Sequence, residues 1–254
     1  MRKTGRSPLM MQHRRHIVLL FLFCLTTGWA SAQKRYNYET RQSRSPKYDF
    51  KTIHFGFELG INYYDFHVTP SETLQNIQDN QNTLYSVDCI ATPGFTLLLI
   101  SDLRLTSFLN LRFTPGISYT QRDMVFDVYN DQLGDFFVAK RQVESTFIEF
   151  PLYLKLRGKR VGNARPFLMG GAKYMIDMAS QELVEDPRLF RIKRFDFAYE
   201  FGFGIDIYFD FFKFSPQIKA STGMRNMVVP DDTIFTEGVV DLTTRCVLIS
   251  FQFE

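Results

Sequence analysis

The sequence predicts an all-β fold, an eight-stranded antiparallel up-and-down barrel, on three observations. Apolar residues recur at every second position in eight segments, which is the period of a strand with two unlike faces. The connections between these segments alternate strictly between long and short. No apolar run of about 18 residues follows residue 32, so a membrane-spanning helix is not expected there.

The first 32 residues have the three parts of a secretory signal peptide. A basic segment precedes the apolar run Ile17 to Leu25, and a small-residue cleavage site follows at Ala30 to Ala32. Nine apolar residues are too few for a membrane anchor, which needs roughly 20. Cys24 follows Phe23, where a lipidation site would need a small residue, so a lipoprotein is the weaker alternative. We therefore predict cleavage after Ala32.

Removal of this segment changes the charge of the chain. Five of its 30 Lys and Arg residues and none of its 27 Asp and Glu residues lie in residues 1–32. The mature chain is then slightly acidic, and nucleic acid is not an expected partner. Residues 33–50 are predicted to be a flexible basic periplasmic tail, a possible docking strip for a periplasmic partner, and residues 51–254 to form the barrel.

The predicted strands all show the two-residue period. They lie at Thr52–Tyr63, Ser86–Arg104, Leu109–Thr120, Thr146–Leu156, Arg165–Asp177, Arg194–Phe209, Lys213–Arg225 and Arg245–Glu254. Proline interrupts several of them, and a closed barrel has no free edge to hold it. We expect bulges or strand ends at Pro93, Pro115, Pro151, Pro166 and Pro216.

The connections place all long loops at one end of the barrel. The long ones are about Thr69–Thr83, Gln121–Gln142, Met178–Lys193 and Met227–Val240, and the short ones are near Leu105–Phe108, Arg157–Ala164 and Phe209–Phe212. Short periplasmic turns and long extracellular loops are typical of a bacterial outer-membrane barrel. The sequence therefore predicts export to the outer membrane of a Gram-negative cell, with membrane lipid around the barrel.

The sixth predicted strand indicates which face meets lipid. From Phe195 to Ile207 every odd position is apolar, which spans roughly 40 Å along a strand at about 3.3 Å per residue. Tilted by about 40°, that covers the apolar band of roughly 25 Å that such barrels present to lipid. A soluble lipocalin-like barrel with its apolar face inward is the alternative. Glycine at Gly56, Gly60, Gly202 and Gly204 on the second face disfavours it, since a water-exposed face more often carries Lys and Glu.

The second face carries charges of both signs. Asp88 and Lys213 are examples of its acidic and basic residues. From this face we predict a polar network in the lumen that comprises Glu58, Arg112, Glu149, Lys155, Lys173, Asp196, Glu200, Asp206, Lys219 and Arg225. Since eight strands enclose just enough space for side chains, these groups should form an ion-paired plug. A proton or ion path is the less favoured interpretation.

Catalytic, cofactor-binding and metal-binding residues are not expected. Only His54 and His67 remain after cleavage, and neither a metal-spaced His/Cys cluster nor a phosphate-binding glycine loop is present. A lipid hydrolase would need a Ser–His pair, for which His67 with Ser71 or Ser118 is the candidate. Cys89 and Cys246 are expected on non-neighbouring strands and opposite faces, as free thiols.

An ordered set of motifs resembles one known family. They are "LNLRFTPGISYTQRD", "VESTFIEFPLYLKLRGKR", "RPFLMGGAKYMIDMAS", "FDFAYEFGFGIDIYFDFFKFSPQIKAS" and the end from Thr244, within Phe95 to Glu254. In this order they resemble PorT, an outer-membrane barrel family associated with the type IX secretion system. The resemblance implies a non-enzymatic component that exports and matures cargo with C-terminal sorting domains, beside other secretion proteins. A lipid hydrolase and a structural or adhesive OmpX-like barrel are the alternatives.

Overall fold

The computed structural model describes residues 51–71, 78–79, 82–130, 134–180, 191–229, 236 and 238–254. The predicted signal peptide and basic tail, residues 1–50, lie outside the described residues. The strands are β1 (Ile53–Pro70), β2 (Gln78–Asp79), β3 (Asn82–Ala91), β4 (Pro93–Arg104), β5 (Leu109–Phe113), β6 (Gly116–Asn130), β7 (Asp135–Arg157), β8 (Ala164–Asp177), β9 (Phe195–Tyr208), β10 (Lys213–Gly223) and β11 (Val239–Phe253).

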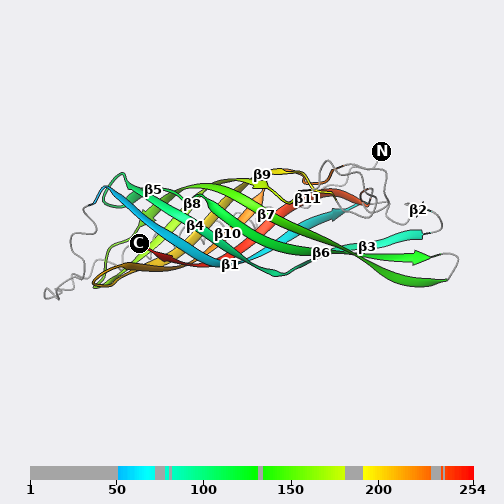
Figure 1. Cartoon of the computed structure of the whole chain (residues 1–254), viewed down its shortest axis with the longest axis horizontal. Helices are drawn as coiled ribbons and strands as arrows, with labels where there is room; N and C mark the ends of the chain where they lie inside the picture. The colour runs from blue at the N-terminus through cyan, green and yellow to red at the C-terminus, as the bar shows by residue number, and fades with distance from the viewer. Residues whose placement is uncertain are drawn as a thin grey trace, which may run out of the picture. The chain divides into compact units, whose positions relative to one another are not determined.

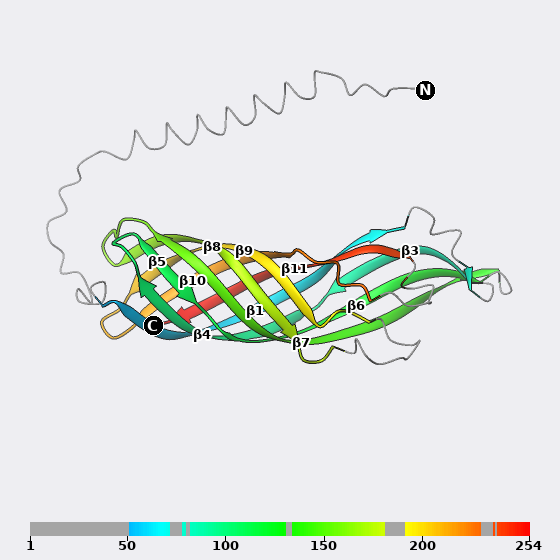
Figure 2. The ribbon, with the colours of Figure 1, turned by 90° about the horizontal axis from the view of Figure 1, so that it is seen from above.

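These strands form one closed antiparallel sheet, shown in Figures 1 and 2. β1 pairs with β11 on one side and with β4 on the other, which closes the ring. β3 and β4 are consecutive and together act as one strand of the barrel. β5 and β6 together act as the neighbouring strand. The ring therefore has eight positions, as predicted, and the short hairpin strand β2 pairs only with β3.

One break changes which side chains point inward. Ala91 of β3 pairs with Arg122 of β6, whereas Phe95 of β4 pairs with Tyr119, so the register moves by one residue around Thr92. A second shift lies between Leu84 and Ser86. Each is a bulge, and each reverses the inward and outward positions of the residues beyond it.

The prolines follow the prediction only in part. Pro93 opens β4 beside the bulge, and Pro115 lies between β5 and β6. Pro151, Pro166 and Pro216 lie inside β7, β8 and β10, where no register shift occurs. Pro216 lies in a gap of the β9–β10 ladder, whose pairs resume at Gln217. At Pro216 the missing N–H is thus accommodated by a local gap in pairing, whereas Pro151 and Pro166 keep their ladder partners Lys173 and Ile205.

The connection expected at Gln121–Gln142 is wrong as a loop, because β6 and β7 continue through it as a long hairpin. Their pairing runs without interruption from Gly116↔Glu149 to Asn130↔Asp135. Gly134, with φ of 65°, supplies the left-handed backbone at the hairpin end. The hairpin, with β3 paired to β6 as far as Asn82↔Asn130, extends beyond the remaining strands of the ring at the end opposite the tight turns (Figure 2).

The outer surface of the ring is an apolar belt. On β9 its members are Phe195, Phe197, Tyr199, Phe201, Phe203 and Ile205, each 41–62% exposed. On β1 the belt ends at Tyr63, and the outward positions beyond it are Asp65 and His67. Arg245 of β11 pairs with Asp65 at this same level without a bulge, so it marks the rim of the belt. Exposed apolar rows of this size are favourable only in contact with lipid or another apolar partner.

Candidate functional site: a filled lumen beneath an apolar cap

The lumen holds a chain of alternating carboxylates and ammonium groups. Lys219 Nζ lies 2.8 Å from Glu58 Oε1 and 3.5 Å from Glu200 Oε1. Lys173 Nζ continues the chain, 3.0 Å from Glu200 Oε2 and 3.5 Å from Glu149 Oε2. All five side chains are at most 3% exposed, so the three carboxylates are stabilised by two ammonium groups and by hydrogen-bond donors of the protein and not by bulk water.

Hydroxyl and amide donors complete the coordination of these carboxylates. Glu58 accepts hydrogen bonds from Ser250 Oγ at 2.7 Å, Gln217 Nε2 at 2.8 Å and Gln252 Nε2 at 3.0 Å. Tyr153 Oη donates to Glu200 at 2.5 Å, and Tyr64 Oη donates to Glu149. A buried ion pair is stable only when such additional bonds satisfy its remaining lone pairs.

A second group of charges lies at the tight-turn end. Arg112 donates through Nε to Asp102 at 2.8 Å and through Nη2 to Glu254 at 2.6 Å. Lys213 Nζ lies 2.7 Å from the other oxygen of Glu254, which connects the last residue to β10. Lys155 Nζ donates to both oxygens of Asp206, at 2.8 and 3.0 Å.

The structure places nine of the ten predicted lumen residues with buried side chains inside the ring. Arg225 is the exception, since it follows β10, is exposed, and donates to the carbonyl of Phe195 at 3.5 Å. The prediction for Arg225 is wrong because β10 ends at Gly223, before that position.

Asp88 is a second error of placement. Asp88 and Asp102 are an even number of residues apart, so an uninterrupted strand would point both inward. The bulge at Thr92 leaves Asp102 in the lumen and turns Asp88 outward. The same bulge places Cys89 inward, so both cysteines face the interior and the expected opposite faces are wrong; both are free thiols.

Above the lumen the interior becomes apolar, and we call this region the cap. Its core joins side chains of β1, β3, β6, β7 and β11 with residues of the connections: Phe66, Leu84, Val87, Met124, Phe126, Val128, Val143, Ile192, Met227, Val228, Val239 and Leu242. Ile192 and Val228 form an isolated β-bridge between two connections. The outward positions of β6 at this level include Gln121, Asp123 and Asp127. The wall is thus apolar on the inside, and on the outside it mixes polar residues with apolar ones such as Ile90 and Val138, unlike the belt.

Arg122 lies at the boundary between the lumen and the cap. Its guanidinium stacks over the Phe66 ring at 3.9 Å and donates to Ser145 Oγ. Arg122 was not among the predicted lumen residues, although it is fully buried. Its position two residues before Met124 on the same face is the signal that could have placed it inside.

The geometry of a hydrolase is missing from the part of the chain that the structure describes. His67 is exposed on the outer side of β1, whereas Ser118 is buried in the lumen and shares a 2.8 Å hydrogen bond with Thr96. Ser71 follows β1, and its amide donates to the carbonyl of Gly238 at 3.0 Å. The described residues contain no group of three His, Cys, Asp or Glu side chains placed to hold a metal ion. They also contain no helix that is long and apolar enough to cross a membrane.

Comparison with known proteins agrees with this architecture. Residues 32–229 match the family described as outer membrane protein beta-barrel domain. The chain belongs to this family. Membership of this family places the protein in the outer membrane, so the ring is an outer-membrane barrel with its belt in the lipid. In such barrels the tight turns lie on the periplasmic side, and the cap then lies outside the cell.

Solved barrels of the outer membrane are similar to this family member at low identity. The outer membrane protein OprG from Pseudomonas aeruginosa is 14% identical, with 78% of this chain and 94% of that chain covered and a TM-score of 0.42. Ail, the attachment invasion locus protein of Yersinia pestis, was solved in complex with the heparin analogue sucrose octasulfate. It is 9% identical, with 80% and 99% covered and a TM-score of 0.37. No curated protein sequence matches the chain.

Proposed function

We propose that this outer-membrane barrel is a non-enzymatic component of the type IX secretion system, needed to export and mature cargo with C-terminal sorting domains. The observation that carries the proposal is the ordered set of motifs between Leu109 and Glu254 that resembles PorT. The location of the chain in the outer membrane is consistent with this role.

The filled lumen limits what such a component can do. Side chains of Glu58, Lys155 and Arg112, all 0% exposed, occupy the space that a cargo would have to cross. An eight-stranded ring is only wide enough for its own side chains. Within the proposal, the barrel therefore acts as an accessory or assembly factor beside a larger translocon, and does not conduct cargo itself.

Its contacts with partners must then lie on its outer surfaces. The extracellular hairpin presents one exposed aromatic group, in which the Phe136 ring lies 5.1 Å from Tyr85 and 4.9 Å from Tyr129. Phe136 is 57% exposed and Tyr85 is 42% exposed, above the lipid belt. Aromatic side chains of this kind are enriched where proteins bind one another.

Deletion of the gene tests the proposal. Periplasmic and secreted fractions of the deletion strain are compared with those of a strain that carries the intact gene in trans. We expect cargo with C-terminal sorting domains to accumulate unprocessed in the periplasm, while an unrelated periplasmic enzyme stays inside the cell.

Two other results would contradict the proposal. Normal export with a defect only in surface binding would indicate a structural or adhesive barrel. Altered lipid A in the deletion strain, restored by the intact gene but not by His67→Ala, would indicate a lipid hydrolase instead.

A further inference from the structure

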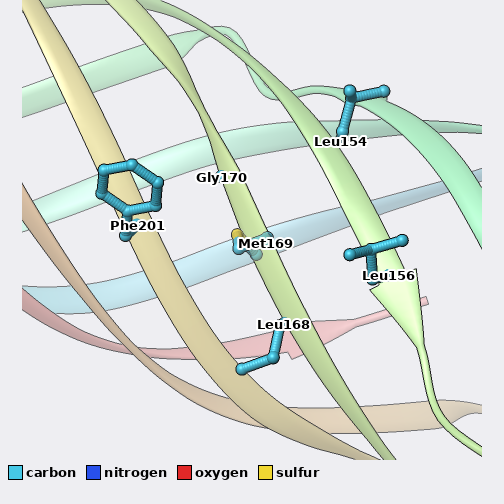
Figure 3. A pocket seen from close by; sticks show the side chains of 6 residues that line it. All are labelled: Leu154, Leu156, Leu168, Met169, Gly170 and Phe201. Atoms are coloured by element: carbon cyan, nitrogen blue, oxygen red, sulfur yellow. The ribbon is translucent and has the colours of Figure 1, made fainter. Parts of the chain in front are cut away.

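β7 has a neighbouring strand on both sides only over its lower half. It spans Asp135–Arg157, and β8 pairs with it from Phe147 to its end. Figure 3 shows part of this paired half, in which Leu154 and Leu156 of β7 lie beside Gly170 of β8. Above Phe147, β7 pairs with β6, and among the described residues no strand pairs with its other side. The upper part of β7 is therefore an open edge of the sheet, on the extracellular side of the belt.

Hydrogen bonds at Thr146 show which backbone groups point toward this edge. The Thr146 carbonyl accepts from the amide of Met178 at 2.8 Å, and the Thr146 amide donates to the Asp177 carboxylate at 3.1 Å, so both groups point toward β8. In an antiparallel strand the N–H and C=O of one residue point to the same side, and the side alternates along the chain. The pairing of β7 with β6 has no register shift above Thr146. The edge groups are therefore those of Val138, Lys140, Gln142 and Glu144.

The open edge has a defined end and a defined pattern of side chains. The amide of Phe136 donates to the carboxylate of the residue before it at 2.8 Å, so the edge begins at Val138. The Val138 side chain is 57% exposed, and Lys140, Gln142 and Glu144 are exposed on the same outer face. The edge thus presents, in order, an apolar group, a cation, an amide and an anion.

An extended polypeptide is the ligand whose chemistry matches this edge. Its N–H and C=O groups recur every second residue, about 6.8 Å apart, and the backbone of another strand presents complementary groups at that spacing. Proline and β-bulges are two devices that blunt such edges. The segment from Val138 to Glu144 contains no proline, and its ladder with β6 contains no bulge.

The charges of the edge disfavour a second copy of this chain as the occupant. Two copies in one membrane have the same orientation, so their edges would meet in parallel. A symmetric pair would then place Lys140 beside Lys140 and Glu144 beside Glu144, and like charges on neighbouring strands are unfavourable. A strand with a carboxylate opposite Lys140 and an ammonium group opposite Glu144 is complementary instead.

We propose that the open edge of β7 binds an extended segment of another protein at the cell surface, which joins the sheet as an antiparallel strand. We choose the antiparallel direction because the whole sheet is antiparallel and this pairing is the more stable one. The segment carries a basic residue opposite Glu144, an acidic residue opposite Lys140 and an apolar residue opposite Val138. Backbone hydrogen bonds provide the affinity, and these three positions provide the specificity. This inference rests on the outer-membrane location and not on the role in secretion.

Fluorescence anisotropy of labelled peptides tests this site on the mature chain in nonionic detergent. The probe KTTTETVTY places Lys opposite Glu144, Glu opposite Lys140 and Val opposite Val138. The matched control ETTTKTVTY exchanges the two charges and keeps the composition. We expect the probe to bind and the control to bind about tenfold more weakly, because two opposite-charge pairs become like-charge pairs.

N-methylated peptides distinguish an added strand from nonspecific contact. Methylation of the third and fifth amides of the probe, which face β7, should abolish binding. Methylation of the fourth and sixth amides, which face away from β7, should leave binding unchanged. In the protein, Val138→Pro removes one N–H from the edge and should weaken binding about fivefold, whereas Val138→Thr keeps that N–H and is its matched control.

The heat-dependent gel shift of folded barrels checks that each variant has folded, and the methylated peptides test the edge even if Val138→Pro does not fold. Failure of the probe to bind, or equal binding of the two methylated peptides or of the two charge orders, would overturn the proposal. Dimers of the chain alone that Val138→Pro abolishes would overturn it as well, since a second copy would then occupy the edge.

Discussion

Lys219→Met tests whether the lumen is a dry, ion-paired core. Lys219 is 1% exposed at its side chain and is the cation between Glu58 and Glu200, at 2.8 and 3.5 Å. Removing one partner of a buried ion pair usually costs about 3–5 kcal/mol, because the remaining charge stays buried without its partner. Glu58 keeps its three hydroxyl and amide donors and Glu200 keeps Lys173, so we expect a loss of about 3 kcal/mol.

The double variant isolates the interaction itself. Glu58→Gln removes the opposite charge, and the pair Glu58→Gln with Lys219→Met leaves no unmatched charge between these two positions. The double variant should therefore lose less free energy of unfolding than the sum of the two single variants, by about 1–3 kcal/mol. Lys140→Met, on the exposed part of β7, is the control and should change the free energy of unfolding by no more than about 0.5 kcal/mol.

Urea unfolding of the barrel in lipid vesicles measures these differences. The signal is far-ultraviolet circular dichroism, because the single tryptophan, Trp29, lies in the predicted signal peptide. A loss below about 1 kcal/mol for Lys219→Met would refute the reasoning, since it would mean that water reaches Glu58 and Glu200 and screens their charges.

Two further substitutions test the cap and the belt. Phe126→Ala removes a fully buried side chain of the cap and should lower its free energy of unfolding by about 3–5 kcal/mol. Protease added to whole cells should then cleave the hairpin faster. Unchanged cleavage would contradict a packed cap. Phe203→Arg places a charge in the lipid-facing belt near the middle of β9 and should lower the free energy of unfolding in vesicles by about 2–4 kcal/mol. Gln121→Arg, above the belt on β6, is its control, and equal effects of the two would mean that the belt does not contact lipid.

Parity along the strands was sufficient to predict most of the lumen. Glu58, Glu149, Glu200 and Lys173 face inward because they alternate with apolar residues on uninterrupted parts of β1, β7, β9 and β8. Eight strands and a polar interior follow from the same alternation. The network of contacts between distant strands could not be derived in this way, because it depends on the tilt and stagger of the closed ring.

The errors have local physical causes. A bulge inserts only one residue, and the alternation of apolar and polar residues does not reveal where it lies. The inward side chain of Cys89 and the outward side chain of Asp88 are therefore not predictable from alternation. The sequence predicts a loop in place of the β6–β7 hairpin because its outward positions lack a continuous apolar face, with Gln121, Asp123 and Asp127 among them. Its inward residues, Met124, Phe126 and Val128, already show the two-residue period, and with them the continuation of the strands above the belt could have been recognised.

The cap and the ring depend on different solvents. The outside of the cap carries Asp123 and Asp127, whose charges are costly in hydrocarbon and favourable in water. The outside of the ring carries apolar rows that are favourable only against lipid or another apolar partner. Neither water alone nor hydrocarbon alone therefore suits the whole length of β6 and β7.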